Sequence, residues 1–299
     1  MSARPHAGLS HRTALLYLAP WLVSLAAFHL YPLASAVHLS FTDRNLLRAT
    51  DPRFVGLANY RAILADPAFA RAMKTTAVFV VGSVPLTILL ALALALFLAR
   101  PMRARGAARA IVFFPSVVSF AVVALVFKSV YAPNGPLLSL LATIGIRLPS
   151  ILNAPSLALP AVMAMDVWMA AGYYAVLLLA GLLAVPADLY DAARLDGAGA
   201  WATLTRITLP AIRPVLLFAL VINSIRAFQV FVEMYVMTRG GPLSSTVTAV
   251  YYLYEEAFFR FEMGRACAAS FILFAVILAL TLLQVWRIGL RAPLTESGR

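Results

Sequence analysis

The stretch Val185–Pro214, VPADLYDAARLDGAGAWATLTRITLPAIRP, is a polar interruption between two long apolar runs. Pro186 marks the start of a short helix, because proline suits the first helical turn. Asp188 and Asp191 follow in that first turn, where the positive end of the helix dipole favours carboxylates. Gly197 is expected to end the helix. The stretch therefore predicts a short amphipathic helix held between two membrane-length segments.

A second short helix is expected after that glycine. Asp196 is of a residue type that caps helix N-termini, and Trp201 and Leu204 follow it at helical spacing. The polar stretch is thus predicted to hold two short helices before the next apolar run begins.

The composition is that of a polytopic membrane protein. Of the 299 residues, 63% are hydrophobic and only 12% are charged, which is too apolar for a soluble domain. The formal net charge of +12 is assigned to contacts with lipid headgroups, and no nucleic-acid partner is expected. The single Cys267 excludes an internal disulfide and a thiolate metal cluster. No metal site is expected either, because the four histidines do not have metal-ligand spacing.

Six apolar runs have about the length that crosses a bilayer, roughly 20 residues. They cover about residues 13–41, 72–98, 110–131, 157–183, 211–237 and 264–286. The sequence therefore predicts an all-α membrane protein with six transmembrane helices. With no internal repeat, residues 1–299 are treated as a single transmembrane domain with a basic tail at residues 1–12.

Six spans place both termini on the same side of the membrane as the polar stretch. A dense arginine cluster (Arg100, Arg103, Arg105 and Arg109) lies on that side and favours the cytoplasm. The loop after the first span also carries five arginines, so charge alone decides little. We expect both termini to be cytoplasmic.

No catalytic constellation is found. The sequence contains no Walker A glycine loop, no paired catalytic carboxylates and no nucleophile elbow. The chain is therefore predicted not to be an enzyme, and any energy for transport must come from a partner.

One long-range motif resembles a known family. Asp191-Ala192-Ala193, three residues, Gly197, nine residues and then Ile207-Thr208-Leu209-Pro210 resemble the "EAA" signature of the membrane subunits of bacterial ABC importers. Asp191 replaces the family's usual Glu. In that family this loop docks on a cytoplasmic ATPase. The resemblance implies a type I ABC importer permease fold, with residues 185–210 as the coupling loop.

Shorter motifs resemble the sugar-permease branch of that family. They are Tyr31-Pro32, Ser40-Phe41-Thr42-Asp43, Phe54–Tyr60 (FVGLANY) and Thr238-Arg239-Gly240-Gly241-Pro242. The resemblance implies import of a mono- or oligosaccharide or a glycerol phosphate derivative. The alternatives are an ABC importer for a non-sugar solute and, from other classes, an ion-coupled secondary carrier or a membrane-embedded enzyme.

The resemblance also implies partners and a location. They are a second permease subunit in a heterodimer, two ATP-binding subunits and an extracytoplasmic solute-binding protein. ATP and Mg are held by the ATPase, so no cofactor is expected in this chain, a multi-pass protein of the bacterial inner membrane in contact with lipid. The residues expected to contact the ATPase, or to shape that contact, are Asp188, Leu189, Asp191, Ala192, Ala193, Arg194, Leu195, Asp196, Gly197 and Trp201.

Polar residues within the spans are costly to place there and indicate function. Asn223, Arg226, Gln229 and Glu233 fall within an arc of roughly 120° on a continuous helix, and the fourth span adds Asp166 and Trp168. These six residues are the candidate lining of a solute path, with Trp168 offering an apolar face to a sugar ring. The alternative is a structural network in which Arg226 pairs with Asp166 or Glu233.

An aromatic group lies between the fifth and sixth spans: Tyr251, Tyr252, Tyr254, Phe258, Phe259 and Phe261. Anchoring at the membrane interface explains such a group. The alternative is contact with the solute-binding protein, assisted by Glu255 and Glu256.

Overall fold

The computed structural model describes residues 11–48, 50–146 and 149–289, and within these ranges the chain is helical, with one isolated bridge between Thr42 and Phe54. The predicted all-α class is confirmed. Most of the predicted basic tail lies outside the described residues. The helices are α1 (His11–Leu25), α2 (Tyr31–Ser40), α3 (Ala58–Leu64), α4 (Pro67–Ala99), α5 (Arg105–Phe113), α6 (Phe120–Val130), α7 (Pro136–Thr143), α8 (Pro155–Leu183), α9 (Ala187–Leu195), α10 (Ala200–Thr203), α11 (Leu209–Ala211), α12 (Arg213–Phe228), α13 (Val232–Met237), α14 (Ala249–Tyr254) and α15 (Met263–Gln284).

Short 3-10 or π-helical turns extend or join several of these helices. They are η1 (Ala26–Leu30), η2 (Phe114–Val117), η3 (Ile151–Asn153), η4 (Leu204–Thr208), η5 (Glu255–Phe259) and η6 (Val285–Gly289).

Four helical segments among the described residues are long and apolar enough to cross a membrane: Leu15–Ser40, Pro67–Ala99, Pro155–Leu183 and Met263–Arg287. Two further pairs qualify only if each bent pair counts as one span. The six predicted spans are reached only when both bent pairs are counted as spans.

The predicted third span is not one continuous helix. Arg105–Val117 and Phe120–Val130 are bent by 93° relative to each other. Pro115 lies just before the bend and lacks the N–H that a continuing helix needs. Val118 and Ser119 then adopt extended backbone angles, so the chain turns before α6 begins.

The predicted fifth span is also broken. Its first residue, Ala211, belongs to Ala200–Ala211, which is bent by 73° from Arg213–Phe228. At the other end α12 stops at Phe228, and Phe231 (φ −145°, ψ −55°) leaves the helical conformation before α13 starts. The four polar residues therefore do not share one continuous helical face, because Glu233 belongs to α13. The following segment, expected as a loop, contains α14.

Contacts divide the chain into two compact units: residues up to Ala65 with Glu255–Phe271, and Asp66–Tyr254 with the residues from Ile272 onward. The single permease domain expected from the sequence stays a prediction.

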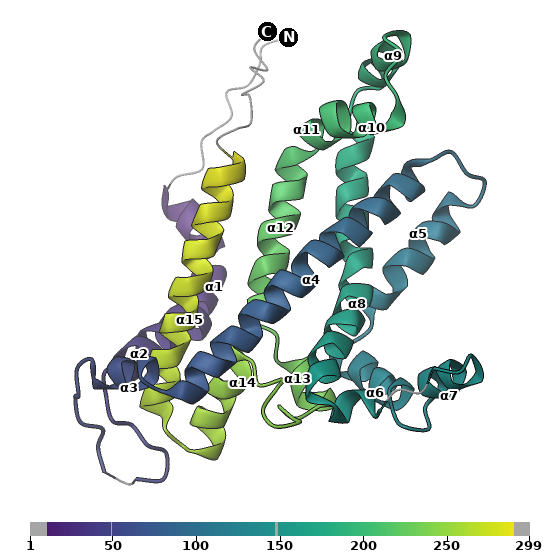
Figure 1. Cartoon of the computed structure of the whole chain (residues 1–299). Helices are drawn as coiled ribbons and strands as arrows, with labels where there is room; N and C mark the ends of the chain where they lie inside the picture. The colour runs from purple at the N-terminus through teal and green to yellow at the C-terminus, as the bar shows by residue number, and fades with distance from the viewer. Residues whose placement is uncertain (1–10, 49, 147–148, 290–299) are drawn as a thin grey trace. The chain divides into compact units, whose positions relative to one another are not determined.

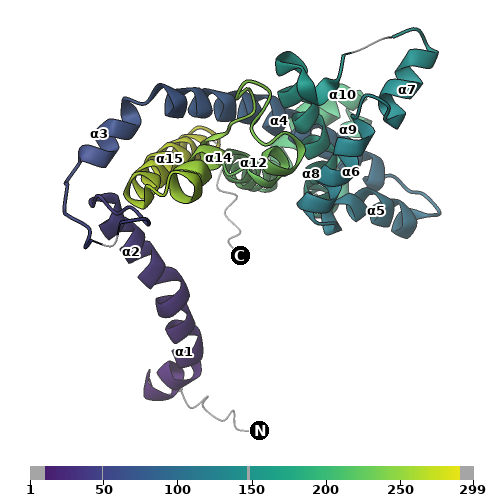
Figure 2. The ribbon, with the colours of Figure 1, turned by 90° about the horizontal axis from the view of Figure 1, so that it is seen from below.

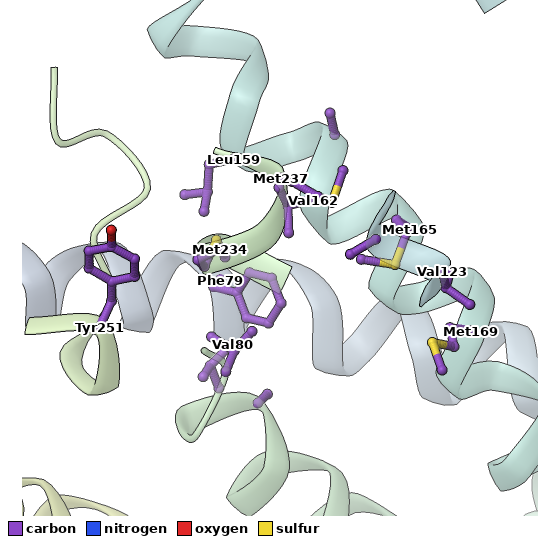
Figure 3. Packing of buried hydrophobic residues seen from close by; sticks show 14 of the residues in the cluster. Phe79, Val80, Val123, Leu159, Val162, Met165, Met169, Met234, Met237 and Tyr251 are labelled. Atoms are coloured by element: carbon purple, nitrogen blue, oxygen red, sulfur yellow. The ribbon is translucent and has the colours of Figure 1, made fainter. Parts of the chain in front are cut away.

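In the larger unit, α4 packs along α8, and α12 packs against both (Figures 1 and 2). α4 starts cleanly because the Asp66 carboxylate accepts a hydrogen bond from the Ala68 amide (2.7 Å), with Pro67 as first helical residue. Figure 3 shows Phe79 of α4, Met165 of α8 and Met234 of α13 meeting in the buried core. This core fixes the helices that carry the polar residues.

In the smaller unit, the short sequence motifs pack on one another. The Asn59 amide donates to the carbonyl oxygens of Ser40 (2.9 Å) and Thr42 (2.8 Å). The hydroxyls of Tyr60 and Ser40 are 2.8 Å apart. Gly264 lies so close that an added Cβ would overlap the Thr42 carbonyl oxygen. The motifs Ser40–Asp43 and Phe54–Tyr60 thus form a joint at the start of α15.

The crossing of α5 and α8 also depends on a glycine. A Cβ at Gly172 would overlap the backbone carbonyl oxygen of Val112, whereas one at Gly106 of α5 would meet open space. Backbone cannot yield as a flexible side chain can, so this crossing excludes larger residues.

Gly172→Ala is therefore expected to destabilise the protein by about 1–3 kcal/mol, the typical cost of overpacking. Gly106→Ala is the matched control and is expected to stay within about 0.5 kcal/mol of the parent. Denaturant unfolding of the detergent-solubilised protein measures both. Equal midpoints for the two variants would contradict the close crossing.

Candidate functional site: a coupling helix and a polar cluster

The polar stretch forms the short helix α9, which Figure 1 shows beyond the end of α8 and away from α6 and α7. Pro186 stands just before the first helical residue, and Asp188 is in the first turn. Gly197 adopts φ +72°, a left-handed conformation that favours glycine. The predicted helix and its glycine stop are therefore present.

The cap predicted for the second short helix is wrong. Asp196 is the residue that closes α9, and Gly199 precedes α10 without any side-chain cap. The left-handed turn at Gly197 separates Asp196 from the second helix, so its carboxylate does not reach that N-terminus.

α9 and the adjoining α10 expose large apolar side chains. Leu195 is 90% exposed and Trp201, on α10, is 76% exposed. Leu189 is exposed as well, beside Asp188, Ala192 and the ion pair of Arg194 with Asp191 (2.9 Å). Large exposed apolar side chains with polar neighbours are typical of a protein contact surface.

Two motif residues face inward instead. Ala193 is buried, and so is Thr208, whose hydroxyl donates to the Tyr190 hydroxyl (3.4 Å) and to the Thr203 carbonyl (3.3 Å). These contacts hold α9 against the segment that leads into α12. The coupling loop is thus a packed element.

An ion pair joins α8 to α12 inside the larger unit. Arg226 donates to both carboxylate oxygens of Asp166, at 2.6 and 2.9 Å, and to the Asn223 side-chain oxygen at 3.1 Å. Asp166 is fully buried, and the Arg226 side chain is 27% exposed. A bidentate pair fixes orientation as well as distance.

Two pockets open beside this pair. The larger, about 320 Å³, is lined by Ser116, Phe120, Met169, Ala170, Tyr173, Tyr174, Ile222 and Arg226. The smaller, about 210 Å³, is lined by Phe120, Arg226, Gln229, Val230, Phe231, Val232 and Glu233. Both pockets share Phe120 and Arg226, and the guanidinium carbon of Arg226 lies 5.6 Å from the Phe120 ring centre.

The structure brings together most, but not all, of the predicted path residues. Arg226 lines both pockets, while Gln229 and Glu233 line the smaller one. Asp166 and Asn223 are buried partners of Arg226 and line neither pocket.

Trp168 lies apart from this cluster. It is 47% exposed, it packs on Phe127 with ring centres 5.4 Å apart, and it lines neither pocket. On α8 it points away from the face that carries Asp166, because two residues separate these positions by about 200°.

Sequence reasoning missed Ser116, Phe120 and Met169 as pocket residues. Phe120 is the first residue of α6, directly after the bend that follows Pro115. A proline inside an apolar run was the available signal, since a break exposes side chains that a straight helix would direct elsewhere.

Glu256 is unavailable for contact with a partner. It is 1% exposed, and its carboxylate pairs with Arg260 (2.6 Å) and Arg265 (3.1 Å) within the smaller unit. Tyr251 and Tyr252 are also buried, and the Tyr252 hydroxyl donates to Asp66 (2.7 Å). The exposed members of the aromatic group include Phe258 and Phe259.

Removing Arg226 is expected to be costly because it strands a buried carboxylate. Arg226→Ala should destabilise the protein by about 3–5 kcal/mol, whereas joint replacement by apolar residues (Asp166→Leu with Arg226→Met) should cost less than the sum of the two single changes. A double-mutant cycle on unfolding free energies measures this. Additive costs would show that the two side chains do not interact.

Comparison with known proteins points to the same family as the sequence motifs. A family model described as "Binding-protein-dependent transport system inner membrane component" matches residues 70–287. The trehalose transport system permease protein SugA of Mycobacterium tuberculosis is 33% identical over 289 residues, which is 96% of this chain and 92% of that protein. The lactose transport system permease protein LacF of Rhizobium radiobacter is 32% identical over 278 residues, or 91% and 92%.

A solved structure shares the fold. A bacterial alginate ABC transporter, crystallised with a periplasmic protein carrying an alginate pentasaccharide, aligns with a TM-score of 0.79 at 24% identity, over 91% of this chain and 93% of that one. The family model and the sequence relatives confirm the resemblance found in the sequence, and the solved structure shows the fold. Members of this family are membrane components of transport systems and are not themselves enzymes. The chain belongs to the binding-protein-dependent transport system inner membrane components.

Proposed function

We propose that this chain is one permease subunit of an ATP-driven ABC importer for a carbohydrate or a carbohydrate-like solute. The observation that carries the proposal is similarity over nearly the whole chain to permeases named for trehalose and lactose transport. The exposed apolar helix α9 and the pockets beside Arg226 supply the two parts that such a subunit needs.

Three kinds of partner complete the importer. A second permease forms the other half of the path, and two ATP-binding subunits hold ATP and Mg. An extracytoplasmic binding protein delivers the solute, which agrees with the family's description and with the periplasmic protein named for the alginate transporter. Both termini and α9 face the cytoplasm, where the ATPase is found.

Coupling begins at α9. Leu189, Leu195 and Trp201 pack against the ATPase, while Asp188, Asp191 and Arg194 make polar contacts at its edge. Because α8 leads into α9 and α12 follows α11, a displacement of α9 on ATP binding moves both helices. The Asp166–Arg226 pair joins these two helices inside the membrane, so they move together.

The path itself runs beside Arg226. Gln229 and Glu233 offer hydrogen-bonding groups in the smaller pocket, and Arg226 does so in both. Amide, carboxylate and guanidinium groups match sugar hydroxyls, which both donate and accept hydrogen bonds. Pockets that are mostly apolar with a few polar groups are typical of small-molecule sites.

The coupling contact is tested by a charge placed on α9. Leu195→Asp is expected to abolish co-purification of the ATPase subunits, because it puts a carboxylate into an apolar contact. Leu243→Asp is the matched control, since Leu243 is 91% exposed but far along the chain from α9. Equal ATPase recovery from the two variants would contradict the coupling role.

The transport function is tested in proteoliposomes that contain both permeases, the ATPase subunits and the binding protein. Uptake of a labelled sugar is expected only with ATP inside the compartment that holds the ATPase, and Arg226→Ala should reduce it at least about tenfold, as loss of a buried charge pair implies. Solute movement by this chain without nucleotide or partners would refute the proposal.

A further inference from the structure

The pockets beside Arg226 carry no surplus positive charge. Among the described residues that line them, the charged side chains are Arg226 and Glu233. Arg226 is already compensated by the bidentate contact with Asp166. Two cations on neighbouring helices, Lys128 of α6 and Arg109 of α5, line neither pocket. Lys128 donates to the Val236 carbonyl oxygen (3.2 Å).

Two hydrogen-bond donors at this cluster nevertheless have no hydrogen-bond partner within the described chain. They are Nε of Arg226 and Nδ2 of Asn223, both buried. Asn223 is fully buried, and its side-chain oxygen is occupied by Arg226. Both atoms have almost no accessible surface, so a solute in the pockets meets only the part of the Arg226 side chain that stays exposed, 27% of it.

Aromatic side chains supply the walls. Phe120 lies under the Arg226 guanidinium, and Tyr173 and Tyr174, which also line the larger pocket, meet edge to face at 5.1 Å. Tyr174 is buried, so Phe120 and the half-exposed Tyr173 are the rings that can meet the C–H face of a sugar ring. Its hydroxyls remain free to accept from the guanidinium.

An anionic solute would bind less favourably in the same pockets. A phosphate, sulfonate or carboxylate that leaves water needs a cation or several donors in compensation. Among the described residues that line the pockets, the cation Arg226 is already paired with Asp166, so it does not compensate a second anion.

We infer that this chain's side of the path takes the uncharged ring of a neutral carbohydrate, with the exposed part of the Arg226 guanidinium donating to a hydroxyl oxygen, and that it disfavours phosphorylated, sulfonated or uronic-acid solutes. The inference rests on the proposed function and narrows its substrate class. The compensated ion pair and the aromatic walls carry it together.

Uptake measurements on the complete importer test the class. Proteoliposomes with the native binding protein and ATPase are given labelled trehalose, lactose, glycerol 3-phosphate or an alginate pentasaccharide, each with ATP. Uptake of an uncharged disaccharide, with transport of both anionic solutes at least about tenfold slower, is expected. This margin corresponds to one missing charge-assisted contact.

The outcomes separate the inference from the function beneath it. ATP-driven uptake of glycerol 3-phosphate or alginate pentasaccharide as the preferred solute would overturn the inference and leave a carbohydrate-type importer standing. Failure of all four solutes, in a complex whose binding protein binds none of them, would overturn both.

The donor role of Arg226 is tested by Arg226→Lys. Lysine keeps a positive charge opposite Asp166 but loses the planar guanidinium fork and its additional N–H donors. The ratio of sugar moved to ATP hydrolysed is expected to fall about tenfold, while Ser129→Ala, on an exposed part of α6 that lines neither pocket, should leave it unchanged. An unaltered ratio in Arg226→Lys would mean that charge pairing is the whole role of the arginine and would overturn the donor assignment.

Discussion

Asp166 is a carboxylate with no exposed surface in the middle of a membrane-length helix, and its compensation comes from Arg226 on another helix. Removing both ions from water costs several kcal/mol each, so the pair is stable only with good geometry and further hydrogen bonds. The bidentate contact and Asn223 provide both. Every other feature of the polar cluster depends on this pair, because it sets where α8 and α12 meet and where the guanidinium faces the pockets.

The Asp166–Arg226 pair also explains how a displacement of α9 can reach the polar cluster between α8 and α12. α8 runs directly toward α9, and α10, η4 and α11 lead from α9 to α12. Ala193 and Thr208 pack this connection tightly. In our proposal a push on α9 is therefore passed to two helices that are joined again at Asp166 and Arg226. Neither helix can shift far alone without exposing the buried carboxylate.

Much of the fold was predictable because its signals are local or compositional. Apolar runs of membrane length predict helices, and the stretch from Val185 to Pro214 carried its own start and stop residues, so α9 appears where expected. The signature order from Asp191 to Pro210 was enough to indicate the family. These features depend on the chain's own neighbours and on the membrane.

The features of the fold and the site that the sequence did not predict depend on tertiary contacts. Hydropathy does not reveal that Pro115 precedes a bend of 93° or that α12 stops at Phe228. Helical spacing placed Glu233 on the face of Arg226, yet the break put it on a separate helix beside the same pocket. The aromatic ring of Trp168 suits a sugar, but its position on α8 directs it away from the face that carries Asp166. Glu256, which the sequence offered as a contact for the solute-binding protein, is buried and paired with two arginines, and no local feature of the sequence indicates this.

The central claim is that α9 carries the motion of a cytoplasmic ATPase into the membrane helices. Its most direct test is a cysteine at position 195 (Leu195→Cys with Cys267→Ala), probed with a membrane-impermeant maleimide in right-side-out and inside-out vesicles. The account predicts labelling from the cytoplasmic face alone, and protection of that cysteine when the ATPase subunits are bound. Labelling from the outer face, or full reactivity in the assembled complex, would contradict it.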